Sequence, residues 1–173
     1  MTVKILVINP NSNDSVTKGM ERALHSQGVA DGIEIQCRTL AAGPFGIESD
    51  DDIRAVVPLV VAEIVKSDKF DAFVIACYSD PGLDECRAIS TKPVFGIHES
   101  AVTAAATKRR RFGVLALGRE SIQRHLNYVR HLGYQAFHAG ERPLDISVDQ
   151  AANDPRVLQK IITTGRELVD EDG

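Results

Sequence analysis

A cysteine at the end of an apolar segment is the side chain best placed for chemistry in this sequence. Cys77 follows the apolar run Ala72–Ala76 and comes three residues before Asp80-Pro81, a pair typical of a helix start. Free backbone N–H groups at a helix start favour a thiolate, the reactive form of the residue. The Ser79 hydroxyl and the N–H groups beside it could stabilise a developing oxyanion. The opposing interpretation is a small packed residue, with Asp80 disfavouring ionisation of the thiol.

Polar residues follow two other apolar runs at positions where parallel strands would end. Asn9, Asn11 and Ser12 follow the first run, and His98 follows the fourth. Ligands of open α/β sheets bind beyond the carboxyl ends of the strands, so these side chains could contact a polar ligand near Cys77. The alternative is a structural role, in which the asparagines only shape a turn.

The remaining cysteines and histidines are expected to be structural or exposed. Cys37 lies in a predicted strand and faces the core, and Cys86 lies in a predicted helix, so both are interpreted as packing residues. No histidines or cysteines have the spacing of a metal site, so we expect no metal centre. Four histidines are interpreted as surface residues: His25, His125, His131 and His138.

Two further segments could bind phosphate, but a simpler interpretation is preferred for each. The basic run Lys108–Arg111 is interpreted as a solvated helix end, because positive charge complements the carboxyl end of a helix. The segment Gly43-Pro44-Phe45-Gly46 lacks the Lys and the Ser or Thr of a phosphate loop, so nucleotide binding is unsupported. It lies in a turn-rich connection, residues 41–52, that can reach over a pocket.

Alternating strands and helices must position these residues. Apolar runs predict strands at Val3–Ile8, Ile33–Cys37, Ala72–Ala76 and Val94–Ile97, the second of them near a sheet edge. Between them, capping residues and helical spacing predict helices that begin at Asp14 or Ser15, at Asp50 and at Asp80, and that end near Gln27, Lys66 and Ile89. Parallel strands need crossover connections, so this alternation predicts an α/β fold with a mostly parallel sheet flanked by helices.

Residues 99–173 repeat this order and predict a second lobe. The predicted elements are a helix at 100–108, a strand at 112–117, a helix at 120–132, a strand at 134–138, a loop through Gly140 and Pro143, and a helix from 154 to about 169. We therefore expect two pseudo-symmetric lobes, residues 1–98 with Cys77 and residues 99–173. The offset between them places a counterpart of Cys77 near position 185, so we expect a truncated sequence with an incomplete second lobe.

Composition and charge exclude several classes of protein. The 173 residues include 20 Lys and Arg against 24 Asp and Glu, a net charge of −4, which provides no one-sided positive field for nucleic acid. The apolar runs are far shorter than the roughly 20 residues that cross a bilayer, and the N-terminus lacks a signal-peptide pattern. We expect a cytoplasmic protein with a small-molecule partner and no membrane contact. The unfinished sheet favours a homo-oligomer.

Four motifs stand in a characteristic order along the chain. They are Ile8-Asn9-Pro10-Asn11, then Gly43-Pro44 with Ile47-Glu48-Ser49, then Ala76-Cys77-Tyr78-Ser79-Asp80-Pro81-Gly82-Leu83, then Pro93-Val94-Phe95-Gly96-Ile97-His98-Glu99. Together they resemble the hydantoin/allantoin racemase branch of the aspartate/glutamate racemase superfamily. Amino-acid racemases of that superfamily usually have Cys-Asn-Thr where this chain has Cys77-Tyr78-Ser79, which favours the cyclic-ureide branch.

The resemblance implies a fold, a mechanism and a set of site residues. The fold has two α/β lobes with the ligand between them, one catalytic cysteine from each lobe, and no metal, pyridoxal or nucleotide cofactor. Cys77 matches the first-lobe cysteine, and the second has no match in these residues. The implied reaction is a two-base proton exchange beside a carbonyl. The implied substrate contacts are Asn9, Asn11, Gly43, Pro44, Tyr78, Ser79 and His98.

Other functions stay open at this point. Ala116-Leu117-Gly118 departs from the threonines that hydantoin racemases commonly have after the corresponding strand, so one wall of the pocket would differ. The same lobes and cysteine would serve a decarboxylase or isomerase of small dicarboxylates, or an amino-acid racemase. A non-catalytic small-molecule-binding protein could have kept the fold without the second base.

Overall fold

The computed structural model describes residues 2–108 and 111–172. The chain forms two compact units, Met1–His98 and Glu99–Gly173, and each is described by itself. That these units are separate domains stays a prediction. Arg109 and Arg110 lie outside the described residues, so the interpretation of the basic run Lys108–Arg111 as a solvated helix end also stays a prediction.

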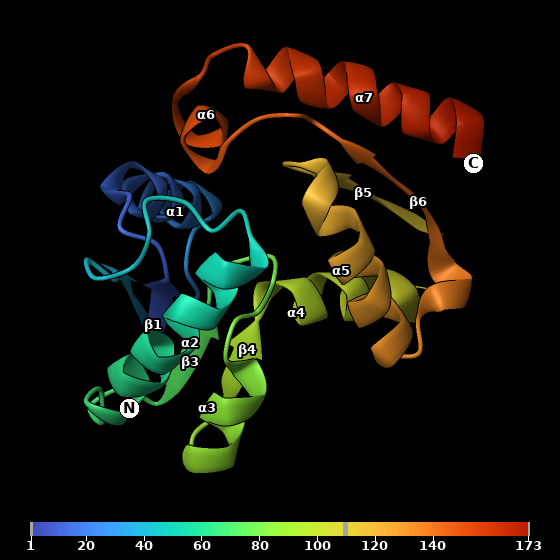
Figure 1. The fold of residues 1–173 in the computed structure, drawn as a ribbon. Coiled ribbons are helices and arrows are strands. Elements are labelled where there is room, and N and C mark those ends of the chain that lie inside the picture. The colour runs from blue at the N-terminus through green and yellow to red at the C-terminus, as the bar shows by residue number, and fades with distance from the viewer. Residues whose placement is uncertain (1, 109–110, 173) are drawn as a thin grey trace. The chain divides into compact units, whose positions relative to one another are not determined.

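A four-stranded parallel sheet forms the centre of the first unit (Figure 1). Its strands follow the order β2-β1-β3-β4. Their bounds are β1 Val3–Asn9, β2 Ile33–Thr39, β3 Ala72–Ile75 and β4 Val94–Gly96. The register pairs Ile8 with Ile75 and Ile75 with Gly96, so three neighbouring strands end at nearly the same level. The predicted edge position of β2 and the predicted α/β class are both confirmed.

Capping residues fix where the helices of this unit begin. Helix α1 (Asp14–Gln27) is capped by the Asn13 side chain, one residue before the predicted caps Asp14 and Ser15. Helix α2 (Asp50–Val65) begins with a capping box, in which the Ser49 hydroxyl accepts from the Asp52 N–H and the Asp52 carboxylate accepts from the Ser49 N–H. The shorter helix α3 spans Leu83–Ile89, and α4 (Ile97–Thr107) begins in this unit and continues into the second.

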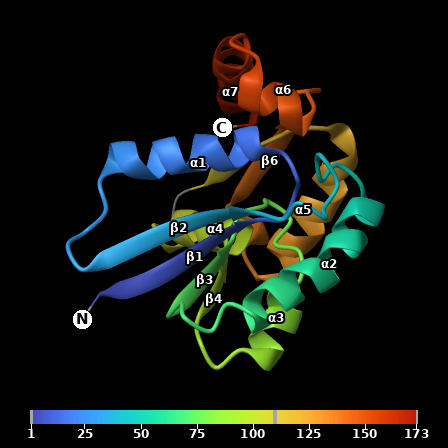
Figure 2. The same cartoon turned by 90° about the vertical axis from the view of Figure 1, so that its left-hand side faces the viewer.

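The core of the first unit lies between one face of the sheet and helices α2 and α3. Leu6 and Ile8 of β1 and Phe73 and Ile75 of β3 share this face and are completely or almost completely buried. They pack with Val60 and Ile64 of α2 and with Leu83 and Cys86 of α3. Figure 2 shows α1 running alongside β2, separate from the α2–α3 pair. Burial of each such side chain stabilises the fold by about 1.5–3 kcal/mol.

A buried carboxylate holds the edge strand β2 to helix α2. Glu63 of α2 is 2% exposed and binds Arg38 of β2, while Lys66 Nζ lies 2.6 Å from its Oε2. Burial pushes the pKa of Glu63 up, but hydrogen bonds and charges from Lys66 and Arg38 outweigh it and hold the pKa below its usual 4.5. Arg38 also donates to the Ser67 hydroxyl at 3.0 Å. The ionised carboxylate therefore fixes β2 against the helix.

The second unit contains a two-stranded parallel sheet, which repeats the strand–helix–strand order of the first. Strand β5 (Phe112–Ala116) pairs with β6 (His138–Pro143), and helix α5 (Arg119–His131) connects them together with a short 3-10 turn, η1 (Gln135–Phe137). Helices α6 (Val148–Asn153) and α7 (Val157–Asp172) follow. The parallel sheets flanked by helices in both units confirm the predicted fold class.

The predicted strand at 134–138 is wrong. Residues 135–137 form the 3-10 turn, and the strand begins at His138 and continues through Gly140 to Pro143. Gly140 and Pro143 favour turns, but pairing with β5 outweighs this preference. Pro143 is tolerated because it is the last residue of the strand, and Gly140 leaves room for Asp172 of α7. A Cβ at Gly140 would lie 2.7 Å from Asp172 Oδ2. The predicted helix from residue 154 instead begins at Val157, with α6 before it.

The interpretation of four histidines as surface residues is also wrong in part. His125 is 5% exposed, and its Nδ1 lies 2.6 Å from Glu141 Oε1 between α5 and β6. His138 is half-buried against the Phe112 ring, and burial, with the charge of Arg130, lowers its pKa in spite of the opposing Glu141. His125 lies in the helix predicted at 120–132, but its burial depends on β6, which the sequence placed at other residues. His25 and His131 are exposed, as predicted.

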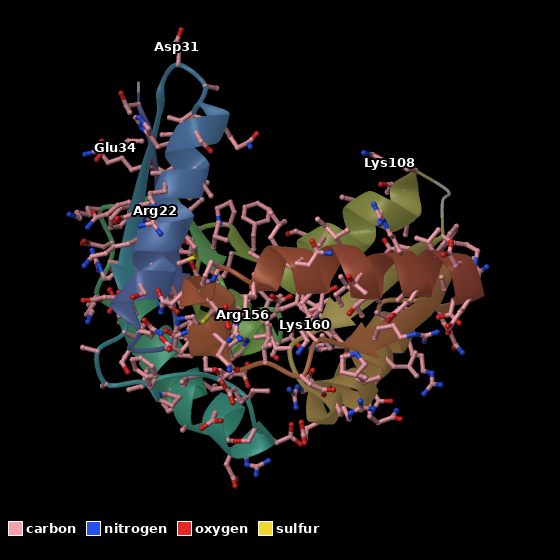
Figure 3. The ribbon with its side chains drawn as sticks, turned by 90° about the horizontal axis from the view of Figure 1, so that it is seen from above. Arg22, Asp31, Glu34, Lys108, Arg156 and Lys160 are labelled. Atoms are coloured by element: carbon pink, nitrogen blue, oxygen red, sulfur yellow. The ribbon has the colours of Figure 1, made fainter. Side chains whose placement is uncertain are left out.

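Charged side chains of both signs extend from the surface of each unit (Figure 3). In the first unit, Arg22 belongs to α1, Glu34 to β2, and Asp31 to the turn between them. In the second unit, Arg156 immediately precedes α7, and Lys160 lies in the first turn of that helix. Within the described residues, no helix has the length and apolar character needed to cross a membrane.

Candidate active site

Three strands of the first sheet end at the same edge, and most of the predicted site residues lie there. Asn9 is the last residue of β1, Cys77 lies two residues beyond β3, and His98 lies two residues beyond β4. Because Ile75 pairs with Gly96 in the register, Cys77 and His98 follow their strands by the same number of residues. The carboxyl edge of a parallel sheet is where α/β proteins bind ligands.

The loop after β1 is held by a network of buried amide groups. Asn9 is 0% exposed, and its Nδ2 lies 2.9 Å from Asn11 Oδ1 and 3.0 Å from Thr17 Oγ1. Its Oδ1 accepts from the backbone N–H of Asn11 at 3.1 Å, and Asn11 Oδ1 accepts from the N–H of Asn13 at 2.9 Å. These polar atoms therefore shape the loop, as the turn alternative expected. Direct contact of Asn9 or Asn11 with a substrate stays a prediction.

Gly43 and Pro44 attach the loop after β2 to the loop after β1. The Pro44 carbonyl accepts a hydrogen bond from the Ser12 N–H at 2.9 Å. A Cβ on Gly43 would lie 2.3 Å from the Pro10 carbonyl oxygen, a distance that real side chains do not tolerate. Gly43 is needed here because two backbones approach closely. The two loops thus form one continuous wall beside the carboxyl end of β1.

Cys77 lies in a tight turn that precedes helix α3. The Asp80 N–H donates to the Cys77 carbonyl at 2.9 Å, and the Leu83 N–H donates to the Asp80 carbonyl at 3.2 Å. Helix α3 begins at Leu83, six residues beyond Cys77, and not at Asp80-Pro81. The prediction that a helix start lies three residues from the thiol is therefore wrong. Asp80 has a positive φ of 43°, so it turns the chain instead of capping the helix.

Tyr78 and His98 bring the β3 loop and the start of α4 together. Their rings stack with centroids 4.0 Å apart and an interplanar angle of 15°. His98 is 1% exposed, whereas Tyr78 and Ser79 are half-buried. Asp80, which is 6% exposed, accepts a hydrogen bond at Oδ1 from the His98 backbone N–H at 3.0 Å. The segment that follows Cys77 is therefore held against His98, which follows the neighbouring strand β4.

The other two cysteines differ from Cys77 in position, and the pKa of each is raised. Cys86 is buried in the core under α3, and burial, assisted by the charge of Glu85, raises its pKa to about 11. Cys37 is half-buried on β2, not in the core as expected, since β2 is an edge strand. Burial, with the charge of Glu21, raises the Cys37 pKa too. A raised pKa disfavours the reactive thiolate at both positions, in agreement with packing roles.

Comparison with known proteins assigns the chain to a family. A sequence model of the Asp/Glu/Hydantoin racemase family matches residues 5–173. The chain belongs to this family. The match includes all three strand-end loops described above, and it confirms the resemblance to the hydantoin/allantoin branch together with the names of the relatives.

Relatives of this racemase family member include named enzymes and a solved structure. It is 43% identical over 117 residues to a hydantoin racemase of Pseudomonas sp. (strain NS671), a match that covers 66% of this chain and 47% of that protein. A hydantoin racemase of Rhizobium meliloti is 32% identical over 173 residues, covering 98% of this chain and 71% of that protein. An allantoin racemase from Klebsiella pneumoniae superposes with a TM-score of 0.92 at 26% identity, covering 99% and 71%. The chain thus spans about half the length of the first relative.

In the part of the chain that the structure describes, no group of three or more His, Cys, Asp and Glu side chains could hold a metal ion.

Two residues that support this site were missed by the sequence analysis or given a different role. Asp80 was interpreted as a helix cap, and Gly96 was not singled out. A Cβ on Gly96 would lie 2.2 Å from the Asp80 Cγ, so the glycine leaves room for that carboxylate. The motif Asp80-Pro81-Gly82 is typical of a turn and could have been recognised in the sequence. The contact of this turn with Gly96 could not, because it depends on the pairing of β3 with β4.

Proposed function

We propose that this protein racemises a cyclic ureide, either a 5-substituted hydantoin or allantoin, with the Cys77 thiolate as one base. The observation that supports this most is the position of Cys77 at the carboxyl edge of the sheet, inside a racemase family match. The names of the relatives, hydantoin racemase and allantoin racemase, give the substrate class. The reaction class is therefore an isomerisation.

The proposed chemistry is a proton exchange at the carbon beside a carbonyl. The Cys77 thiolate takes the proton, and the C–H electron pair moves toward the carbonyl oxygen and leaves a planar carbon. A proton donor on the opposite face then returns a proton and completes the inversion. The negative charge on the oxygen has to be stabilised by hydrogen-bond donors, each contributing roughly 3–4 kcal/mol. The Ser79 hydroxyl and the N–H groups of Tyr78 and Ser79 are the proposed donors.

The other predicted site residues have supporting roles in this proposal. We propose that Tyr78 and His98, whose rings stack on each other, form one wall beside the thiol. The amide network of Asn9 and Asn11, with Gly43 and Pro44 against it, holds the neighbouring loop in shape. We propose that this loop presents its polar backbone to the ureide ring.

The second base of a two-thiol mechanism is not found in the second half of this sequence. Residues 99–173 contain no cysteine. Inversion needs a donor on the second face, so with Cys77 as the sole thiol we expect slow exchange or none. The experiments below therefore use the complete natural gene product, whatever its length.

Deuterium incorporation tests the proposed substrate class. An enantiopure 5-substituted hydantoin, allantoin and aspartate are each incubated with the protein in D2O, and NMR follows loss of the C–H signal beyond the uncatalysed rate. A parallel sample with maleate is followed for the appearance of fumarate, which would support a dicarboxylate isomerase instead. We expect exchange on hydantoin or allantoin only. Exchange on aspartate would instead support an amino-acid racemase. Binding of hydantoin without exchange would contradict the proposal and support a non-catalytic binding protein.

The cellular setting also belongs to the proposal. A cytoplasmic location, a small-molecule partner and a homo-oligomeric state remain predictions of the sequence.

A further inference from the structure

Asp80 combines burial with a backbone conformation that side chains rarely adopt. Its φ is 43°, and the residue is 6% exposed. A non-glycine residue in this region is strained and persists only when its surroundings hold it there. The strain lies three residues from the proposed catalytic thiol, within the turn closed by the Asp80 N–H and the Cys77 carbonyl.

The Asp80 carboxylate connects this turn to the start of helix α4. Its Oδ1 accepts from the His98 backbone N–H at 3.0 Å. An N–H in the first turn of a helix has no acceptor within the helix, and the positive end of the helix dipole favours a carboxylate there. The same His98 stacks its ring on Tyr78 at 4.0 Å. Two contacts therefore join the segment Cys77–Asp80 to one residue of α4.

Gly96 provides the space that the carboxylate occupies. A Cβ at Gly96 would lie 2.2 Å from the Asp80 Cγ, 2.3 Å from Oδ2 and 2.5 Å from Oδ1. The φ of Gly96 does not lie in the positive range that favours glycine, so the reason for a glycine here is lack of space. The last residue of β4 is thus shaped to receive the Asp80 side chain.

We propose that Asp80 is a positioning residue, whose carboxylate, seated over Gly96 and bound to the His98 N–H, holds the Cys77 thiol and the Tyr78–Ser79 donors in their reactive arrangement. This inference rests on the proposed function in one respect, namely that Cys77 is the base. It goes beyond that function because it assigns Asp80 and Gly96 a role without contact with the substrate.

The chain offers well-matched variants for this proposal. Asp80→Gly removes the carboxylate but accepts the positive φ, and Asp80→Asn keeps an acceptor oxygen at a residue type that tolerates this conformation. Asp145 is the other non-glycine residue with positive φ among those described, at 49°, and it is exposed in the second unit. Asp145→Gly therefore makes the same chemical change at the same kind of backbone, in the other unit.

The first measurement is hydrogen exchange of the His98 amide, resolved by NMR, which needs no enzymatic activity. We expect exchange at least tenfold faster in Asp80→Gly and less than threefold faster in Asp80→Asn and Asp145→Gly. An unchanged rate in Asp80→Gly overturns the proposal, because the carboxylate would then not hold this N–H.

The second measurement is the rate of deuterium incorporation into the hydantoin. In Asp80→Gly we expect kcat to fall at least tenfold with KM within threefold, and Asp80→Asn to recover most of kcat. Gly96→Ala should lower kcat at least tenfold in the parent chain but less than threefold in the Asp80→Gly background. Faster His98 exchange with unchanged kcat overturns the positioning role. No activity in the parent protein contradicts the proposed function alone, while the hydrogen-exchange result still decides whether the Asp80 contact exists.

Discussion

At the residue scale, three cysteines of one chain occupy three different environments. Cys86 is buried in the core with a pKa raised to about 11, Cys37 is half-buried on an edge strand, and Cys77 lies in a strand-end loop. The sequence was sufficient to separate them, because Cys77 alone follows a buried strand directly. It could not reveal the strained Asp80, because the φ of 43° arises from contacts with residues 16 and 18 positions further along the chain.

Replacing Asn9 tests whether its amide is structural. Asn9→Ala leaves the Asn11 N–H without its acceptor and removes one of the hydrogen-bond partners of the Thr17 hydroxyl, which also contacts Thr39 Oγ1, so we expect the free energy of unfolding to fall by about 1–3 kcal/mol. Urea denaturation measures this loss. Asn127→Ala, at an exposed position of α5, is the matched control and should change stability by less than about 0.5 kcal/mol. A neutral Asn9→Ala would show that the amide is free to serve a ligand instead.

Two glycines should respond in opposite directions to the same added methyl group. Gly43→Ala places a Cβ 2.3 Å from the Pro10 carbonyl, so we expect a loss of about 1–3 kcal/mol as the two loops separate. Gly19 lies within α1 with its nearest neighbour at 3.9 Å, and Gly19→Ala should stabilise the helix by up to about 1 kcal/mol. Thermal unfolding compares the two variants. Equal effects would contradict the close approach of the loops.

At the scale of the elements, strands of the first unit could be predicted well and those of the second less so. Continuous apolar runs identify β1 and β3, since strands buried on both faces need no polar residues. Strand β6 has the sequence His-Ala-Gly-Glu-Arg-Pro, which shows neither an apolar run nor alternation. Its pairing with β5 and its packing against α5 and α7 decide its conformation, and no local pattern reports such contacts.

The ionic contact between β2 and α2 predicts a pH dependence of stability. The pKa of Glu63 is lower in the folded chain than the usual 4.5, so its contribution is complete above about pH 4.5 and is lost as pH falls through the lower, folded value. Glu63→Gln should cost about 1–3 kcal/mol at pH 7, since it removes the charge that Arg38 and Lys66 bind. The difference from the parent chain should shrink toward pH 3.

Urea denaturation at pH 7, 5, 4 and 3 measures this difference. Glu34→Gln removes an exposed partner of Lys4 and serves as the matched control, with an effect below about 1 kcal/mol at every pH. A Glu63→Gln difference that stays constant from pH 7 to pH 3 would show that ionisation of Glu63 contributes nothing.

At the scale of the whole molecule, the family match and the fold both support a candidate site at the carboxyl end of the first sheet. The family match spans residues 5–173, and the superposition on an allantoin racemase covers 99% of this chain. The order β-α-β recurs in the second unit, where the strand-end residues Ala116 and Leu117 are apolar. The fold class and the family could be read from motifs, because glycines, prolines and a cysteine at strand ends leave short recognisable patterns. The amide network of the first loop and the Asp80–Gly96 contact depend on side-chain geometry and could not.

The most direct test of the proposed function compares two cysteine variants in one assay. Cys77→Ser and Cys37→Ser are prepared in the complete natural gene product, and deuterium incorporation at the stereocentre of an enantiopure 5-substituted hydantoin is followed by NMR in D2O. We expect the Cys77→Ser rate to fall at least 100-fold, toward the uncatalysed rate, because a serine hydroxyl is a far weaker acid than a thiol and supplies little base at neutral pH. Cys37→Ser should stay within about twofold of the parent, since that thiol is half-buried on β2 outside the site. Normal exchange in Cys77→Ser would contradict the assignment of Cys77 as the base.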